Sequence, residues 1–453
     1  MASASASECS HRSVQFECSR HAAQAGFKRP NMQERLAATK LENDKLLPSP
    51  ALVKGNPETF PGPLVLPGDE IAEDPEYPPQ SLQEWFDEED RNSVTPSRRT
   101  VYVVPPPQIT NAVDFLEPWS QPKDNRQEDR VEPPLTEEVH EYLSAFYHGL
   151  PVKLMPRSTL RLVRWNSGAT AANSTSKAKA QRPRFVGLQV SRQCVRIRIR
   201  RSKDGVFDGQ LNLNDLLDAA ISMLPKDAYA LLFLVNHDIY EDENDDFACG
   251  RAYGGSRVAV VSSARYNPNL DEVESVERLH AWPASHCESY TSAFCDAADE
   301  DSKPKKTSKS RTKTKQNKGN VGSSTSRVWP MEAAISIHRT LPIEGLTGTS
   351  LAALWLGRVC RTASHELGHC FGIDHCMYYA CSMQGTASVG EDASQPPYLC
   401  PVDLVKVLHA TSTTAIRRYN ALLQFCEKPH RKNEHIFAPF AAWIRGRLVE
   451  LEE

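Results

Sequence analysis

The sequence predicts a mixed α/β domain, and three observations lead to this prediction. Apolar runs of strand length, such as 229–235, alternate along the chain with amphipathic stretches of helical period, such as 212–223. Strands and helices that follow one another at this spacing favour an α/β sheet. Hydrophobic residues make up 40% and charged residues 24% of the 453 residues, which is typical of a globular protein with one large or two ordinary domains.

Residues 1–134 differ in composition from the rest of the chain. They contain 18 of the 32 prolines, and acidic residues concentrate at 69–90, around Trp85 and Phe86. Such a stretch buries too little apolar surface to offset its ordering entropy, so we expect a disordered, proline- and acid-rich N-terminal region. Trp85 and Phe86 could then form a short docking motif for a protein partner.

The folded domain is expected at 135–430. A helix with one apolar face is expected to begin at Thr136 and to end before Gly149. Strands are predicted at 185–190, 195–199, 229–235 and 257–262, and a helix at 212–223 with Asn212 or Asn214 as its cap. The run at 229–235 is continuously apolar, as in a strand covered on both faces. The C-terminal tail at 431–453 includes an apolar patch at 436–444 that could form a closing helix.

Residues 297–327 are expected to be a disordered basic insertion in this domain. Between 303 and 318 the chain has eight Lys or Arg residues and no apolar residue. A nuclear-import or nucleic-acid patch is one interpretation, and a solvated loop is the other. We favour the loop, and the net charge of −4 also argues against general binding to polyanions.

The sequence also bears on the cellular compartment. No apolar run approaches the roughly 18 residues that a membrane helix needs, and residues 1–10 lack the basic start and apolar core of a secretory signal. We therefore expect a cytoplasmic or nuclear protein without a membrane segment. In that setting the 12 cysteines are expected to be thiols or metal ligands and not disulfides.

A candidate metal-binding motif lies near the end of a helix predicted at 351–372, with Ser350 as its cap. His365 and His369 are four residues apart. They therefore project from one helix face, and both imidazoles can reach one metal ion. Glu366 follows the first histidine and can point toward a metal-bound water.

A third imidazole follows the predicted end of this helix. Gly372 suits a left-handed stop, after which His375 can meet the other two histidines. Three neutral histidines leave one tetrahedral position of zinc open for water, which is the arrangement of a catalytic site. Glu366 would take a proton from that water and pass one to the leaving amine, so the motif predicts zinc-assisted hydrolysis of a peptide bond.

These residues resemble the motif of a known family. The spacing His365-Glu366-x-x-His369-x-x-Gly372-x-x-His375 is similar to that of the metzincins, and the cysteines and Met383 that follow resemble the archaemetzincins specifically. This resemblance implies a zinc metalloprotease with a metzincin-like fold, in which a twisted mixed sheet packs against a backing helix and the active-site helix. It also implies that Met383 is the methionine of the Met-turn beneath the zinc.

The same resemblance implies a second zinc site made of four cysteines. Three positions match, at Cys376, Cys381 and Cys400, but the fourth is Asp403. A carboxylate is a permitted but harder ligand than a thiolate. Three outcomes are open. The site could persist as a weaker Cys3Asp set, Cys370 or His409 could complete the shell, or the site could be lost. The remaining cysteines, Cys9 and Cys287 among them, show no ligand spacing.

Two functions are therefore weighed. The first is a zinc-dependent metallopeptidase with Glu366 as general base, acting on a peptide or protein substrate. The alternative is a zinc-binding interaction protein without significant turnover. The intact Glu366 favours the first, and the altered Asp403 position speaks mildly for the second.

Overall fold

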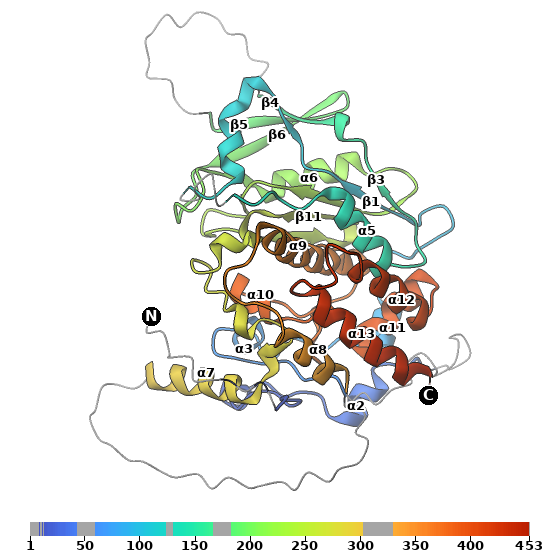
Figure 1. Cartoon of the computed structure of the whole chain (residues 1–453). Helices are drawn as coiled ribbons and strands as arrows, with labels where there is room; N and C mark the ends of the chain where they lie inside the picture. The colour runs from blue at the N-terminus through green and yellow to red at the C-terminus, as the bar shows by residue number, and fades with distance from the viewer. Residues whose placement is uncertain are drawn as a thin grey trace, which may run out of the picture.

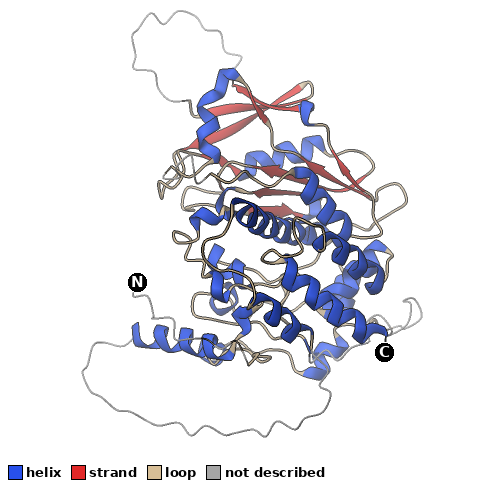
Figure 2. Cartoon of the chain, viewed as in Figure 1, coloured by secondary structure: helices blue, strands red, loops and turns tan. Residues whose placement is uncertain are grey.

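The structure is a computed structural model, and it describes residues 9, 11, 13–42, 59–123, 130–165, 183–301 and 329–452. Strands occupy one half of the molecule, and most of the helices occupy the other (Figure 1, Figure 2). The mixed α/β fold expected from the sequence is confirmed.

A mixed five-stranded sheet forms the centre of the molecule. In spatial order its strands are β10 (Gly250–Tyr253), β11 (Val258–Ser262), β8 (Ala228–Val235), β1 (Thr100–Val104) and β3 (Val152–Leu154). Only β10 runs antiparallel to its neighbour. All residues of β8 are buried, as its apolar sequence predicts. Leu232 and Leu234 pack into one core cluster, while Leu231 and Phe233 pack into another on the opposite side.

A second sheet lies beside the first, at the top of Figure 1. Its strands, in spatial order, are β2 (Gln108–Ile109), β4 (Leu160–Arg164), β5 (Phe185–Val190), β6 (Gln193–Arg200), β7 (Gln210–Asn212) and β9 (Ile239–Tyr240). In β6 the buried Ile197 alternates with the exposed Arg196 and Arg198, so one face of this strand is wet.

Helices cover both faces of the central sheet. α9 (Gly348–Cys370) packs on β11, β10 and β8, and α5 (Thr136–Phe146) packs beside it on β3 and β1. On the other face, α6 (Leu213–Met223) packs on β11 and β8 and is capped by the Asn212 side chain, as predicted. The cap of α9 differs from the prediction: the Thr347 side chain accepts from the Ser350 amide, so Ser350 lies inside the helix.

The helical half of the molecule contains most of the remaining helices. These are α1 (His21–Ala25), α2 (Met32–Ala37), α3 (Glu70–Glu73), α4 (Leu82–Asp87), α7 (Glu288–Asp301), α8 (Pro330–His338), α10 (Val389–Ser394), α11 (Pro401–Thr411), α12 (Ala415–Cys426) and α13 (Phe437–Glu452). Short 3-10 segments are η3 (Asn111–Ser120), η5 (Arg157–Thr159), η6 (Gly254–Ser256), η7 (Ala264–Tyr266), η8 (Pro268–Leu270), η9 (Arg278–His280) and η10 (Ala284–His286).

The C-terminal segment at 431–453, considered as a tail that could be helical, contains α13. This helix packs against α8 and α12, and its Trp443 ring stacks on Tyr398 with ring centroids 4.2 Å apart. It is thus part of the folded core. Only Glu453 of this segment lies outside the described residues.

The expectation that residues 1–134 are disordered is wrong for the described part of that region. β1 lies between β8 and β3 in the central sheet, so the domain boundary expected at residue 135 is wrong as well. Trp85 is fully buried and its Nε1 donates to the carbonyl of Phe371 at 2.9 Å. The composition predicted disorder wrongly, because this region is stabilised by long-range contacts and not by a core of its own.

Part of the predicted basic insertion can be compared with the structure. Residues 297–301 belong to α7, and 302–328, including the basic run at 303–318, lie outside the described residues. None of the helices in the described ranges combines the length and the hydropathy needed to span a lipid bilayer.

Candidate functional site

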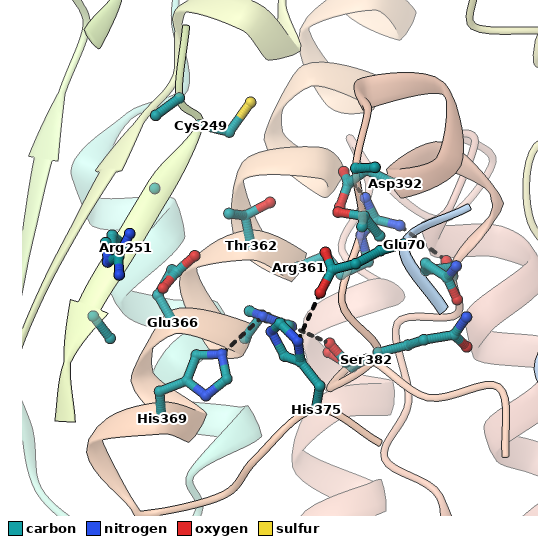
Figure 3. Close-up of a pocket in the computed structure, with 18 of the residues that line it drawn as sticks. Glu70, Cys249, Arg251, Arg361, Thr362, Glu366, His369, His375, Ser382 and Asp392 are labelled. Carbon is teal, nitrogen blue, oxygen red and sulfur yellow. Dashed lines mark hydrogen bonds and ion pairs between the residues drawn. The ribbon is translucent and has the colours of Figure 1, made fainter. Parts of the chain in front are cut away.

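A cavity lies between the end of α9, strand β10 and the segment before α10. Its volume is about 760 Å³. Figure 3 shows Glu366, His369 and Thr362 entering it from α9, Arg251 from β10, and His375 and Ser382 from the segment that follows the helix.

The three histidines predicted from the motif converge in this cavity. His365 and His369 lie on successive turns of α9, with ring centroids 4.7 Å apart. Gly372 adopts a φ of +74°, the left-handed conformation expected of the helix stop. The chain then turns back, and the His375 ring centroid lies 5.4 Å and 5.0 Å from those of His365 and His369.

Hydrogen bonds fix the orientation of all three rings. Each Nδ1 faces an oxygen that can only accept, so each Nδ1 carries the proton and each Nε2 keeps its lone pair. The Nδ1 contacts are His365 to the Ser382 carbonyl at 2.8 Å, His369 to the Ile373 carbonyl at 2.8 Å, and His375 to Glu70 Oε1 at 2.9 Å.

The unprotonated ring nitrogens then meet without a hydrogen between them. Nε2 of His365 and Nε2 of His369 are 3.1 Å apart. Two lone pairs at this distance repel unless a cation lies between them. Zn–N bonds of about 2.0–2.1 Å in a tetrahedral site separate neighbouring nitrogens by roughly 3.3 Å. Burial, together with the neighbouring imidazoles, lowers the pKa of His369 to about 4 and that of His365 well below its usual value. Both rings are therefore neutral at pH 7, and the donor set fits zinc.

Glu70 was missed by the sequence analysis. It lies at the start of α3, and its backbone amide donates to the Glu391 carboxylate at 3.1 Å. The hydrogen bond to His375 holds the pKa of Glu70 below its usual value despite burial. A carboxylate in this position orients an imidazole and makes it a better ligand. The only signal was an acidic residue in a stretch that appeared to be disordered.

Glu366 lies beside the three rings, on the wall of the cavity. Burial raises its pKa to about 8, opposed by the charge of Arg251 on β10. The backbone of β10 passes close to this carboxylate: a Cβ at Gly250 would lie 3.2 Å from Glu366 Oε1. Gly250 therefore allows the strand to approach the carboxylate.

Met383 lies against α9 directly beside the histidine turns. A Cβ at Gly368 would lie 2.4 Å from its sulfur, so the glycine is needed for this contact. The Met383 carbonyl also accepts from the Cys376 amide at 2.8 Å. Met383 therefore packs against the helix turn that lies between His365 and His369.

The four positions of the predicted second site also lie together. The donor atoms of Cys376, Cys381, Cys400 and Asp403 lie within 4.8 Å of one another, and all four residues are buried. The two sulfurs of Cys376 and Cys400 are 3.5 Å apart, and Asp403 Oδ2 is 3.2 Å from the Cys381 sulfur. These separations match the edges of a tetrahedral zinc site, roughly 3.3–3.8 Å for bonds of about 2.0–2.3 Å.

Two other residues considered for the fourth position do not join this group. His409 packs its ring against Trp85 and Phe86, and Cys370 is absent from the cluster of donors among the described residues. Of the three outcomes left open, the geometry favours a Cys3Asp set.

Lys406 compensates for the carboxylate and was also missed by the sequence analysis. Its ammonium lies 3.0 Å from Asp403 Oδ1 and donates to the Gln80 carbonyl at 2.7 Å. Burial and the Cys376 sulfur raise the pKa of Asp403 to about 7, opposed by Lys406. The thiol of Cys376 has a pKa well below its usual value: burial would raise it, but hydrogen bonds from Cys381, Cys400 and the backbone outweigh burial. Without a bound cation, negative charge is therefore favoured on Cys376 and disfavoured on Asp403.

The residues that follow β8 have two different environments. Glu241 lines the cavity and pairs with Arg251. Asp238 is fully buried and pairs with Arg265 at 2.6 Å, and the buried His237 lies 3.1 Å from the Leu116 carbonyl. Only Glu241 is thus within reach of a ligand in the cavity.

Comparisons with known proteins agree with this site. Residues 340–407 match the model of peptidase family M54. Archaemetzincin-2 of Homo sapiens is 22% identical over 368 residues, which cover 81% of this chain and 74% of that protein. Archaemetzincin-1 of Rattus norvegicus is 28% identical over 222 residues, which cover 49% of this chain and 34% of that protein. The crystal structure of archaemetzincin from Methanopyrus kandleri aligns with a TM-score of 0.30 and 14% identity, over 70% of this chain and 98% of that one.

The site and the family match together define the class of protein, which is a zinc metallopeptidase. Residues 340–407 match the model of peptidase family M54, and the chain is similar to archaemetzincins over most of its length, as its histidine and cysteine motif predicts.

Proposed function

We propose that this chain hydrolyses peptide bonds with Glu366 as general base and a zinc ion held by the Nε2 atoms of His365, His369 and His375. One observation supports this proposal most directly. All three rings are oriented by hydrogen bonds at Nδ1, so their Nε2 lone pairs are free to bind one shared metal ion. When bound, zinc supplies Lewis acidity and lowers the pKa of a coordinated water to roughly 7.

The proton transfers in this proposal belong to Glu366. Its carboxylate takes the proton of the attacking water and returns it to the amine that leaves. Burial favours the protonated form of Glu366, with a pKa of about 8, so the positive charges around it are needed to keep it ionised at neutral pH. Arg251 supplies one such charge from β10, and a divalent cation on the histidines would supply the larger one.

The substrate is proposed to bind in extended form along β10. This strand is at the edge of the central sheet, and its residues Gly250, Arg251 and Ala252 line the cavity. An unpaired strand edge offers backbone donors and acceptors to a peptide, which could pair with it as a further strand. A peptide there would lie beside Glu366.

We further propose that Cys376, Cys381, Cys400 and Asp403 hold a second zinc ion. Because all four donors come from the protein, this site would be closed to substrate and structural. Lys406 would offset part of its negative charge. Met383 is proposed as the Met-turn residue that supports the α9 turns.

The test of the general base is the Glu366→Gln variant. With full-length protein and a fluorogenic peptide library, we expect a roughly 10²–10⁴-fold loss of rate, because the amide cannot accept a proton. Zinc content, measured by mass spectrometry, should equal that of the wild type. Glu272→Gln, at an exposed loop position, is the matched control and should keep full activity.

Wild-type rates in Glu366→Gln would refute the proposed role of this carboxylate. The alternative of a zinc-binding interaction protein is not favoured, because such a protein has no need of a buried carboxylate on the wall of an open cavity beside three imidazoles. Absence of chelator-sensitive cleavage across the library in the wild type would reverse that preference.

A further inference from the structure

A third group of metal-ligating side chains shares no residue with the two sites described above. The donor atoms of Cys9, His11 and His280 lie within 4.8 Å of one another. Cys287 lies beside one member of this group, with its sulfur 3.3 Å from Nδ1 of His11. His11, His280 and Cys287 are buried, and Cys9 is half-buried. The group is formed by residues 9 and 11 and by residues just before α7, which is labelled in Figure 1.

Backbone pairing fixes the N-terminal segment in register with its partner. Val14 forms an antiparallel bridge with Cys287. The Glu288 amide donates to the Ser13 carbonyl at 3.0 Å, and the Gln15 amide donates to the His286 carbonyl at 2.8 Å. Residues 13–15 are therefore held beside 286–288 by backbone contacts, and Cys9 and His11 immediately precede this paired segment.

His280 stacks its ring on Tyr290, with ring centroids 4.0 Å apart, and this packing leaves its Nε2 free to act as a ligand. Its Nδ1 lies 2.8 Å from the Glu277 carboxylate, and its side chain is 7% exposed. Its Nε2 is buried and has no hydrogen-bond partner among the described residues. An imidazole whose Nδ1–H is held by a carboxylate while Nε2 is left free is the arrangement found around protein-bound metals. A buried ring nitrogen without a partner is otherwise costly.

The distances around His11 fit a metal shell. Its Nδ1 lies 3.7 Å from the Cys9 sulfur and 3.3 Å from the Cys287 sulfur. Zinc bound to one nitrogen and one sulfur separates these two atoms by roughly 3.5 Å, from bonds of about 2.0 and 2.3 Å at a tetrahedral angle. The same spacing occurs in the cluster of Cys376, where the two sulfurs are 3.5 Å apart.

Strain at His11 is a further sign that this position is constrained. Its φ is +45°, a left-handed conformation that is unfavourable for a residue with a side chain. Such strain persists where the surrounding structure requires it, often at ligand sites. Here it places the His11 ring 5.2 Å from the His280 ring.

We propose that Cys9, His11, His280 and Cys287 bind a zinc ion that fastens the N-terminal segment to the body of the protein. Two thiolates and two imidazoles are the donor set of a closed, structural zinc site. Binding would release the protons of the two thiols, so occupancy should rise with pH. The Ser289 hydroxyl, 3.0 Å from the Cys9 sulfur, is placed to donate to the thiolate.

Zinc content per chain tests this proposal. The full-length double variant Cys9→Ser, His11→Asn should contain one zinc fewer per chain than the wild type by mass spectrometry. The matched control is Cys194→Ser, His430→Asn, which replaces an exposed cysteine and an exposed histidine outside all three clusters. It should retain the wild-type content. Equal zinc in the double variant and the wild type would overturn the proposal.

A second measurement on the unmodified protein does not depend on how the variants fold. Cys9 should be protected from alkylation in the presence of zinc and should react after a chelator is added, while Cys194 reacts in both conditions. If a reductant and not a chelator exposes Cys9, a Cys9–Cys287 disulfide explains the cluster and the metal proposal is wrong. If Cys9 reacts freely before any treatment, the proposal is wrong as well. Neither readout uses peptidase activity, so both are independent of the proposed role of Glu366.

Discussion

Trp85 and Phe86 are adjacent, yet the structure gives them opposite environments. Trp85 is fully buried, its Nε1 donates to the Phe371 carbonyl at 2.9 Å, and the Arg91 guanidinium lies 4.0 Å from its ring. Phe86 is 38% exposed. Because Phe371 immediately follows the helix that carries His369, Trp85 supports the turn that leads to His375. Replacing Trp85 should therefore weaken the fold near the histidine site.

The contacts give the size of the effect. Truncating a buried tryptophan to alanine costs about 3–5 kcal/mol through lost transfer energy and the cavity left behind. The lost hydrogen bond to the Phe371 carbonyl adds about 1 kcal/mol. Trp85→Ala should thus lower the free energy of unfolding by about 4–6 kcal/mol. Phe86→Ala should lower it by about 1 kcal/mol or less, since much of that side chain is already in water.

Urea unfolding of the two variants and the wild type, followed by circular dichroism at saturating zinc, measures this difference. Phe86→Ala is the matched control, because it removes an aromatic ring at the neighbouring position. Equal stability of the two variants, to within about 1 kcal/mol, would contradict the placement of this segment against α9 and α11. It would favour the docking motif that the sequence suggested.

Three other predictions follow from single contacts. Glu70→Ala should weaken zinc binding at the three-histidine site roughly 10–100-fold in a chelator competition. Glu70→Gln should weaken it less, because the amide oxygen still accepts a hydrogen bond from His375. Unchanged zinc affinity in both variants would exclude Glu70 as a positioning residue. Burial lowers the pKa of His237 to about 4, so its contribution to stability is present above pH 6.5 and is lost as pH falls toward 4. His237→Asn should reduce the acid-induced drop in unfolding free energy by about 3 kcal/mol, and an unchanged drop would refute this. Asp403→Cys should retain the second zinc at higher chelator concentrations than the wild type does, because a thiolate is a softer ligand. Loss of this zinc at a lower chelator concentration than in the wild type would show that Lys406 requires the carboxylate.

The catalytic motif was predicted from the sequence because its geometry is local. His365 and His369 are one helical turn apart in any α-helix, and Gly372 can end that helix in a left-handed conformation. The strand β8 was equally clear from its apolar run, since a strand buried on both faces needs no polar alternation. These features depend only on periodicity and on the conformational freedom of one residue.

The second cluster was predicted only in part. The spacing of Cys376, Cys381 and Cys400 indicated that they belong together, but it left the role of Asp403 open. Its side chain lies between two thiols and an ammonium, and that ammonium belongs to Lys406, one turn further along α11. The packing of α11 against the cysteine segment decides this, and no pattern in the sequence reports it.

The N-terminal region is where the sequence analysis failed, and the reason is physical. Its prolines and acidic residues predict disorder when the segment is considered alone, because it has no core of its own. In the folded protein its residues are stabilised by distant partners: β1 by β8 and β3, Trp85 by Phe371, and Cys9 by Ser289 of α7.

The sequence by itself thus determined the helix with its two histidines, the glycine turn and the buried strand, because chain geometry over a few residues fixes them. The tertiary structure decided which carboxylate orients His375, which cation offsets Asp403, and which cysteines and histidines meet near α7. Those pairings join residues far apart in the chain, and only the packing of the whole molecule brings their atoms within bonding distance.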